Sequence, residues 1–113
     1  MQVPKWKLIK KNDSCEVLDL RLSDFTVSIT HLSGGKTTQG HSHPGEEVYI
    51  FPEKGITMVL GNKEKLSGLG TTLYIPSGVF HQARNNSMGQ ISFICIFKER
   101  ETIEKGGEKW TLT

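Results

Sequence analysis

Residues 35–47 read GKTTQGHSHPGEE and residues 70–85 read GTTLYIPSGVFHQARN, and these two stretches decide the fold. In the first, His41 and His43 are separated by a single residue. On an extended chain such a pair projects both imidazoles from one face, roughly 6.6–6.8 Å apart along the strand. The two rings can therefore converge on one ion.

Two further side chains extend this pair into a ligand set. Glu47 lies four residues after His43, beyond a Pro-Gly turn that can bring its carboxylate to the same side. His81 comes just after Pro76-Ser77-Gly78, at the start of another extended segment. Imidazole nitrogens with one carboxylate suit Fe(II), Mn(II), Ni(II), Co(II), Cu(II) or Zn(II) rather than Ca(II). We predict one divalent transition metal ion held by four side chains, with open positions for water or substrate: His41, His43, Glu47 and His81.

The spacings in both stretches resemble the paired motifs of the cupin superfamily. The first motif, Gly-x5-His-x-His-x(3 or 4)-Glu-x6-Gly, spans residues 35–55, and its closing glycine, Gly55, comes after seven residues instead of six. The second, Gly-x5-Pro-x-Gly-x2-His-x3-Asn, is matched at every position in residues 70–85. From residue frequencies, a chance match to the second motif should occur on the order of once in tens of thousands of such chains.

The resemblance implies an all-β fold, a small double-stranded β-helix barrel of the jelly-roll type, with the metal inside. It also implies a homodimer. In this fold Gly35, Gly70 and Gly78 would adopt positive φ at turns, and Pro76 would rigidify the entry to the segment that presents His81. Asn85 is expected to stabilise a turn rather than bind the metal.

Composition bounds the function classes. The 113 residues are the length of one domain, residues 1–113, and 14 Lys+Arg against 12 Asp+Glu give a net charge of +2. Without a dense basic patch we expect no nucleic-acid partner. No apolar run approaches the roughly 18 residues of a membrane span, and MQVPKWKLIKK lacks the apolar core of a signal peptide. We therefore expect a cytoplasmic protein that binds a small molecule.

Apolar residues recur with a period nearer two than 3.6, which predicts strands between glycine and proline turns. Phe25, Val27 and Ile29 share one face of a predicted half-buried strand, whereas Ile91–Phe97 is apolar on both faces and is expected to be buried on both sides. The short charged segment Glu99–Lys105 is the one helical candidate. The predicted strands are Cys15–Arg21, Phe25–His31, Val48–Phe51, Ile56–Leu60, Lys63–Leu66, Thr71–Ile75, Val79–Arg84 and Ile91–Phe97.

The same period assigns residues to the pocket. If Glu47 faces inward, Tyr49 and Phe51 do so too, Gln39 precedes His41 on its face, and Met58 is a candidate on a neighbouring strand. We predict Glu47 and Tyr49 as catalytic residues, and Gln39, Tyr49, Phe51 and Met58 as substrate contacts.

Three residues are expected to lie outside this pocket or to have no role in it. His31 shares a face with apolar residues and is expected to be satisfied away from the metal. The two cysteines, Cys15 and Cys95, are too few for a disulfide framework and are expected to be small buried hydrophobes.

Three functions fit these residues. The first is a metal-dependent enzyme on a small polar metabolite, with isomerisation of a sugar or sugar phosphate as the leading reaction because the segments around Tyr49 and His81 resemble small cupins of that kind. The second is a metal-dependent dioxygenase, in which a redox metal takes O2 and substrate in the open positions. The third is a non-catalytic binding or sensing module, because one fold hosts many functions.

Overall fold

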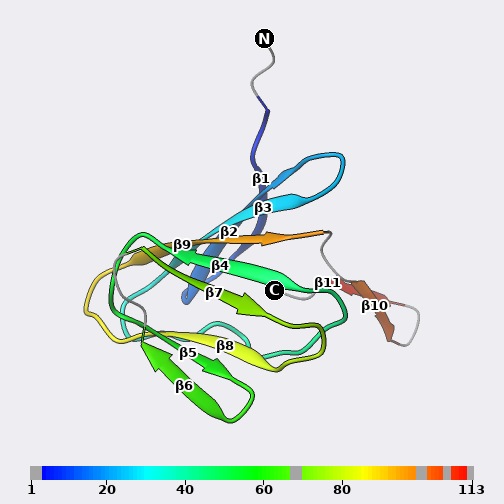
Figure 1. Ribbon diagram of the computed structural model, residues 1–113. Coiled ribbons are helices and arrows are strands. Elements are labelled where there is room, and N and C mark those ends of the chain that lie inside the picture. The colour runs from blue at the N-terminus through cyan, green and yellow to red at the C-terminus, as the bar shows by residue number, and fades with distance from the viewer. Residues whose placement is uncertain (1–3, 67–69, 99–101, 106–107, 112–113) are drawn as a thin grey trace.

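The computed structural model describes residues 4–66, 70–98, 102–105 and 108–111, and every regular element in those ranges is a β-strand (Figure 1). Among the described residues there is therefore no helix long and apolar enough to cross a membrane. The strands are β1 (Lys7–Lys11), β2 (Cys15–Arg21), β3 (Thr26–Leu32), β4 (Glu47–Phe51), β5 (Ile56–Leu60), β6 (Lys63–Leu66), β7 (Thr71–Ile75), β8 (His81–Asn85), β9 (Ile91–Phe97), β10 (Thr102–Lys105) and β11 (Glu108–Thr111).

The strands build two antiparallel sheets that face each other. Six strands pair in the order β1-β2-β3-β9-β4-β7, and three pair in the order β6-β5-β8. Figure 1 shows the smaller sheet lying below the larger one, with the β10–β11 hairpin at one side. The turns that join the strands use glycines with positive φ, including Gly35, Gly70 and Gly78, as predicted. The sequence-based prediction of an all-β fold with short strands is confirmed.

Two terminal segments differ from expectation. The helix predicted at Glu99–Lys105 is wrong, because Thr102–Lys105 is strand β10 and pairs antiparallel with β11; residues 99–101 lie outside the described ranges. A charged segment of about seven residues is too short to form a helix by itself, whereas pairing with β11 satisfies its backbone. At the other end, β1 was not predicted, and it pairs with β2.

The inward face of β3 is the polar one. Thr26, Ser28 and Thr30 are buried, whereas Val27 and Ile29 are half-buried on the outer face. The predicted alternation of two faces is confirmed, and the polar face is the one that points inward. On that outer face Val27 and Ile29 lie opposite isoleucines of β9, at positions 96 and 94. The outer surface of the large sheet is thus apolar, and the barrel interior is partly polar.

Strand β9 also has a buried inner face and a half-buried outer face. Its inward residues Ile91, Phe93 and Cys95 are buried, and Ile94 and Ile96 are only half-buried, so the predicted burial on both sides is wrong for the isolated chain. The reason is that the opposite sheet covers one face of β9, whereas the described part of the chain leaves the other face only partly covered.

An aromatic cluster fills the space between the sheets. The rings of Tyr49 and Phe93 have centroids 5.6 Å apart, and Phe51 lies 5.5 Å from Phe93. Phe51 and Phe93 have almost no exposed surface, and burying each such side chain contributes about 1.5–3 kcal/mol. This cluster fixes β4 against β9 and so positions the first residue of β4, which is Glu47.

Candidate metal centre

Backbone hydrogen bonds assemble the three predicted histidines at one end of the barrel. The backbone N–H groups of His41 and His81 each donate to the other residue's carbonyl, at 3.2 and 2.9 Å, which sets the two residues directly opposite each other. The N–H of Gly78, in the Pro76-Ser77-Gly78 turn, donates to the carbonyl of His43 at 2.8 Å. The second motif therefore holds the first in place through the main chain.

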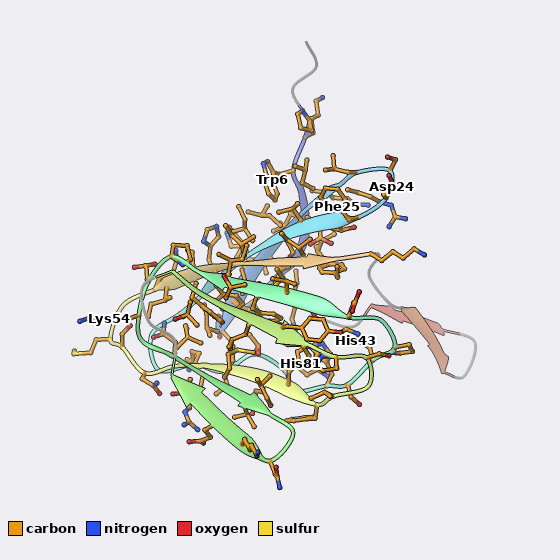
Figure 2. The ribbon with its side chains drawn as sticks, in the orientation of Figure 1. Trp6, Asp24, Phe25, His43, Lys54 and His81 are labelled. Atoms are coloured by element: carbon orange, nitrogen blue, oxygen red, sulfur yellow. The ribbon has the colours of Figure 1, made fainter. Side chains whose placement is uncertain are left out.

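The three imidazoles converge as predicted. One nitrogen from each of His41, His43 and His81 can be chosen so that all lie within 4.8 Å of one another, an arrangement that could hold a metal ion. The ring centroids are 4.5–5.2 Å apart. Figure 2 shows His43 and His81 close together between the two sheets.

Each imidazole is oriented by a nearby backbone carbonyl. The Nδ1 atoms of His41, His43 and His81 lie 3.1, 3.0 and 2.9 Å from carbonyl oxygens, those of Gln39, Pro44 and Val79 respectively. A carbonyl only accepts hydrogen bonds, so each Nδ1 carries the proton and donates it. In the neutral imidazole this leaves the Nε2 lone pair free for a metal, and fixing the ring through its second nitrogen is typical of metal-binding histidines.

The carboxylate of Glu47 lies against two of these rings. Its Oε1 is 3.2 Å from Nε2 of His43 and 3.3 Å from Nε2 of His81, and its side chain is buried. Burial alone raises the pKa of Glu47, but its close contacts with His43 and His81 outweigh burial and lower the pKa to about 2. Glu47 is therefore ionised at neutral pH and lies beside two of the histidines, and its role as a metal ligand stays a prediction.

A cation fits between these groups. When Nδ1 carries the proton, the imidazole Nε2 atom is a hydrogen-bond acceptor, and so is the carboxylate oxygen. The Nε2 atom of His43 and the Oε1 atom of Glu47, 3.2 Å apart, therefore need a proton or a metal ion between them. The Nε2 of His81 is fully buried and makes no hydrogen bond of acceptable geometry, although it lies near Glu47. A buried polar atom left without a partner is costly, and a metal ion would satisfy it. The donor set thus fits a divalent transition metal.

The protonation state of His41 agrees with this role. Burial and the neighbouring His81 lower the pKa of His41 to about 4. His41 is therefore neutral at pH 7, and a neutral imidazole is the form that binds metals.

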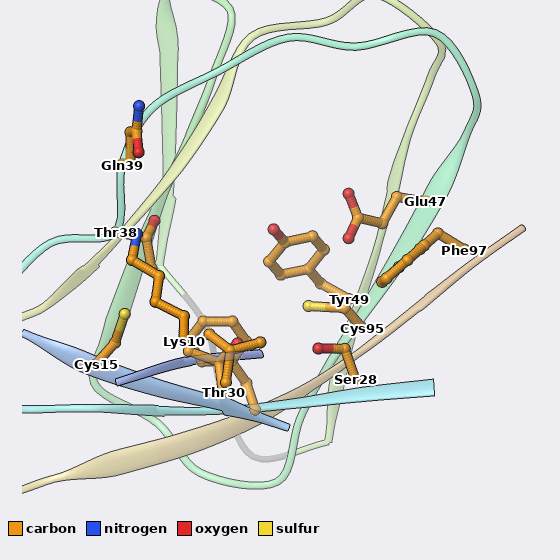
Figure 3. A pocket seen from close by; sticks show the side chains of 12 residues that line it. Lys10, Cys15, Ser28, Thr30, Thr38, Gln39, Glu47, Tyr49, Cys95 and Phe97 are labelled. Atoms are coloured by element: carbon orange, nitrogen blue, oxygen red, sulfur yellow. The ribbon is translucent and has the colours of Figure 1, made fainter. Parts of the chain in front are cut away.

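A small cavity adjoins the metal ligands. It has a volume of about 30 Å³, and Glu47, Tyr49 and Gln39 all contribute to its wall (Figure 3). Tyr49 is buried with its ring 5.9 Å from that of His81, whereas Gln39 is exposed and lies at the mouth instead of inside the barrel. Phe51 and Met58 are fully buried in the core and do not line this cavity, so their contact with a substrate stays a prediction.

Other residues singled out in the sequence lie elsewhere. His31 is on the outer face, where its Nδ1 is 2.6 Å from Oγ of Ser92. Arg84 also points outward and pairs with Glu64. Asn85 stabilises a loop: its amide donates to the carbonyls of Leu32 and Gly89, and its oxygen accepts two hydrogen bonds from Ser87.

Sequence reasoning missed several cavity residues. Ser28 and Thr30 line the cavity because the polar face of β3 is inward, and Lys10 reaches it from the unpredicted strand β1. Cys15 and Cys95 are buried free thiols as expected, and both also line the cavity. An alternating Thr-Ser-Thr face opposite an apolar face was the one available signal for the β3 residues.

Comparison with known proteins identifies the family. The sequence profile of the cupin domain matches residues 28–97, more than half of the chain. The chain belongs to the cupin family. The two facing antiparallel sheets are therefore the jelly roll of cupins, and the fold predicted from the two motifs is confirmed.

Several solved structures superpose on this chain at low sequence identity. An RmlC-like cupin from Shewanella frigidimarina is 15% identical, with a TM-score of 0.72 over 83% of this chain and 84% of that one. The protein TT1209 from Thermus thermophilus is 22% identical, with a TM-score of 0.72 over 83% and 92% of the two chains. AerE from Microcystis aeruginosa is 16% identical, with a TM-score of 0.78 over 97% of this chain but 53% of its own. A search of curated proteins finds no match.

Proposed function

We propose that this cupin binds one divalent transition metal ion through His41, His43, Glu47 and His81 and acts as a metal-dependent enzyme on a small polar metabolite. The observation that supports it most is the buried Glu47 carboxylate 3.2–3.3 Å from two imidazole Nε2 atoms that backbone carbonyls orient. Charge and hydrogen bonding of this kind inside a barrel are costly unless a ligand completes them.

The chain's own residues have distinct roles in this proposal. The metal, when bound, would polarise a substrate oxygen as a Lewis acid. Glu47 is buried and ionised, so its carboxylate can accept a proton from a bound substrate and return it. Tyr49 lines the cavity beside His81, where its hydroxyl can orient a substrate oxygen. The surrounding aromatic cluster excludes water from this side of the site.

The first reaction to test is isomerisation of a sugar or sugar phosphate, because that reaction needs proton transfer at a carbon beside a polarised carbonyl. A dioxygenase would use the same ligands but consume O2. A screen of sugars and sugar phosphates under strict anaerobiosis, paralleled by an oxygen electrode, separates the two. Product without O2 supports the isomerase, and O2 uptake coupled to product overturns it in favour of the dioxygenase.

Metal content tests the proposal most directly. Elemental analysis of the purified protein should find about one transition metal ion per chain, and His81→Ala should lose most of it. His31→Ala is the matched control, since His31 is on the outer face and contacts Ser92. A wild-type protein that neither contains nor takes up a transition metal would refute the proposed function. Bound metal without any turnover favours the binding or sensing module instead.

We also propose that two copies pair through the outer face of the six-stranded sheet. That face presents the half-buried side chains of Val27, Ile29, Ile94 and Ile96, which a second copy would cover. Sedimentation equilibrium should give twice the chain mass, and Ile29→Lys should shift it to the monomer. A wild-type monomer at micromolar concentration refutes the pairing.

A further inference from the structure

The register between β1 and β2 contains an irregularity that changes the direction of one lysine. Leu8 lies opposite Leu18, but the next paired position is Lys10 opposite Val17, so Ile9 is an additional residue in β1. An extra residue of this kind is a β-bulge, and bulges often redirect a side chain beside a functional site. Residues directly opposite each other in a sheet project from the same face. Since Val17 is buried inside the barrel, Lys10 also projects inward.

The next residue in β1, Lys11, lies at the surface, in contrast to Lys10. Lys11 lies opposite Glu16, and its Nζ is 3.6 Å from the Glu16 carboxylate at the surface. Lys10 instead is half-buried and lines the same cavity as Glu47 (Figure 3). Figure 3 shows its side chain extending from β1 toward Thr38, across the cavity from Glu47. Within the described residues, Lys10 has no carboxylate partner.

The lining of the cavity carries charges of both signs. Among the described residues that line it, Lys10 is the only positively charged side chain and Glu47 the only negatively charged one. Ser28 and Thr30 add hydroxyl groups between these two ends. A ligand that fits this distribution has oxygen atoms toward the metal ligands and an anionic group toward Lys10.

We infer that Lys10 binds the carboxylate of a small hydroxy acid whose other end reaches the metal centre. This inference rests on the proposed function, because it names the substrate class of the same site. A carboxylate is favoured over a phosphate because a single ammonium group offers one charge and a carboxylate is the smaller group. The acid must also be short, about two carbons, because a cavity of about 30 Å³ is close to the size of two water molecules. Lys10 is thus a specificity-determining residue that β1 contributes from outside both motifs.

The test compares three ligands with the same two-carbon chain. Glycolate carries a carboxylate, ethylene glycol is its neutral counterpart, and 2-hydroxyethyl phosphate carries the alternative anion. Dissociation constants are measured by NMR titration at constant ionic strength, for the metal-free protein and for the Zn(II)-loaded protein. A charge-assisted hydrogen bond should make glycolate bind about tenfold more tightly than ethylene glycol.

Three variants assign that preference to Lys10. Lys10→Met keeps the length of the side chain and should abolish the tenfold preference, whereas Lys10→Arg should retain most of it. Lys11→Met is the matched control and should bind all three ligands as wild type does. Equal loss in Lys10→Met and Lys11→Met, or no preference in wild type, overturns the inference. Tighter binding of the phosphate than of glycolate also overturns it.

This experiment distinguishes a failure of the Lys10 inference from a failure of the proposed function. Zn(II) content is measured in every variant, and Lys10→Met should bind as much metal as wild type because Lys10 is not a predicted ligand. Normal Zn(II) binding without a carboxylate preference rejects the role of Lys10 and leaves the metal centre standing. Failure of the wild-type protein to take up Zn(II) or any other transition metal rejects the proposed function.

Discussion

Glu47→Gln removes one charge from the candidate metal centre and keeps the shape of the side chain. In the metal-free protein Glu47 contacts His43 and His81 at 3.2 and 3.3 Å, and those contacts lower its pKa from 4.5 to about 2. This difference corresponds to about 3 kcal/mol of stability at neutral pH. We therefore expect the free energy of unfolding of Glu47→Gln to fall by about 3 kcal/mol at pH 7.

The pH dependence of this stability loss follows from the direction of the Glu47 pKa shift. A carboxyl group with a lower pKa in the folded state contributes its stability above the unfolded value of 4.5 and loses it as the pH falls toward 2. The difference between wild type and Glu47→Gln should therefore narrow progressively below pH 4.5. Glutamine cannot titrate, so the variant provides the baseline.

The assay is urea unfolding of protein stripped of metal with a chelator, followed by circular dichroism between pH 7 and pH 3. Glu46→Gln is the control, because Glu46 is exposed and contacts only the hydroxyl of Tyr74 among the described residues. It should change stability by less than about 0.5 kcal/mol. Equal stability of Glu47→Gln and wild type at pH 7, or a difference that does not narrow in acid, would refute the reasoning.

Two further predictions concern the second motif and the protonation of the site. Asn85→Ala should destabilise the protein by about 3 kcal/mol in urea unfolding, because it removes the side-chain donor to the carbonyl of Leu32, one of two donors to that of Gly89, and the acceptor for the N–H of Ser87; a loss under 1 kcal/mol contradicts this. Because burial and His81 lower the pKa of His41 from 6.5 to about 4, metal-free stability should be full above pH 6.5 and decline as the pH falls toward 4. His41→Gln should decline less over that window, and an identical slope argues against a buried neutral His41.

The cluster of candidate metal ligands could be predicted because spacing alone constrains it. The His-x-His pair, Glu47 and His81 fit two motifs, and the structure brings them together at one end of the barrel. Period two also placed Tyr49 and Phe51 inward, and both are buried. These spacings act within short segments, and side chains two residues apart share a face wherever the segment is extended.

The face of β3 could not be predicted in the same way. Alternation shows that Thr26, Ser28 and Thr30 share one side of a strand, but it does not say which side meets the opposite sheet. The usual assumption that apolar side chains go inside fails on this strand because Ser28 and Thr30 line an interior cavity. Lys10 was missed for a related reason, since a bulge is a property of the register between two strands and leaves no mark in one of them.

The carbonyl groups that orient the three histidines belong to residues one or two positions away in the sequence. His41 uses the carbonyl two residues before it, His81 does the same, and His43 uses that of the next residue. A backbone carbonyl is present whatever side chain occupies the position, so substitution at Gln39, Pro44 or Val79 does not remove the acceptor. Each histidine is thus inherited together with its orientation in a segment of two or three residues. This gives the centre a tolerance to sequence drift and makes such segments portable units for grafting a metal site onto another β-barrel.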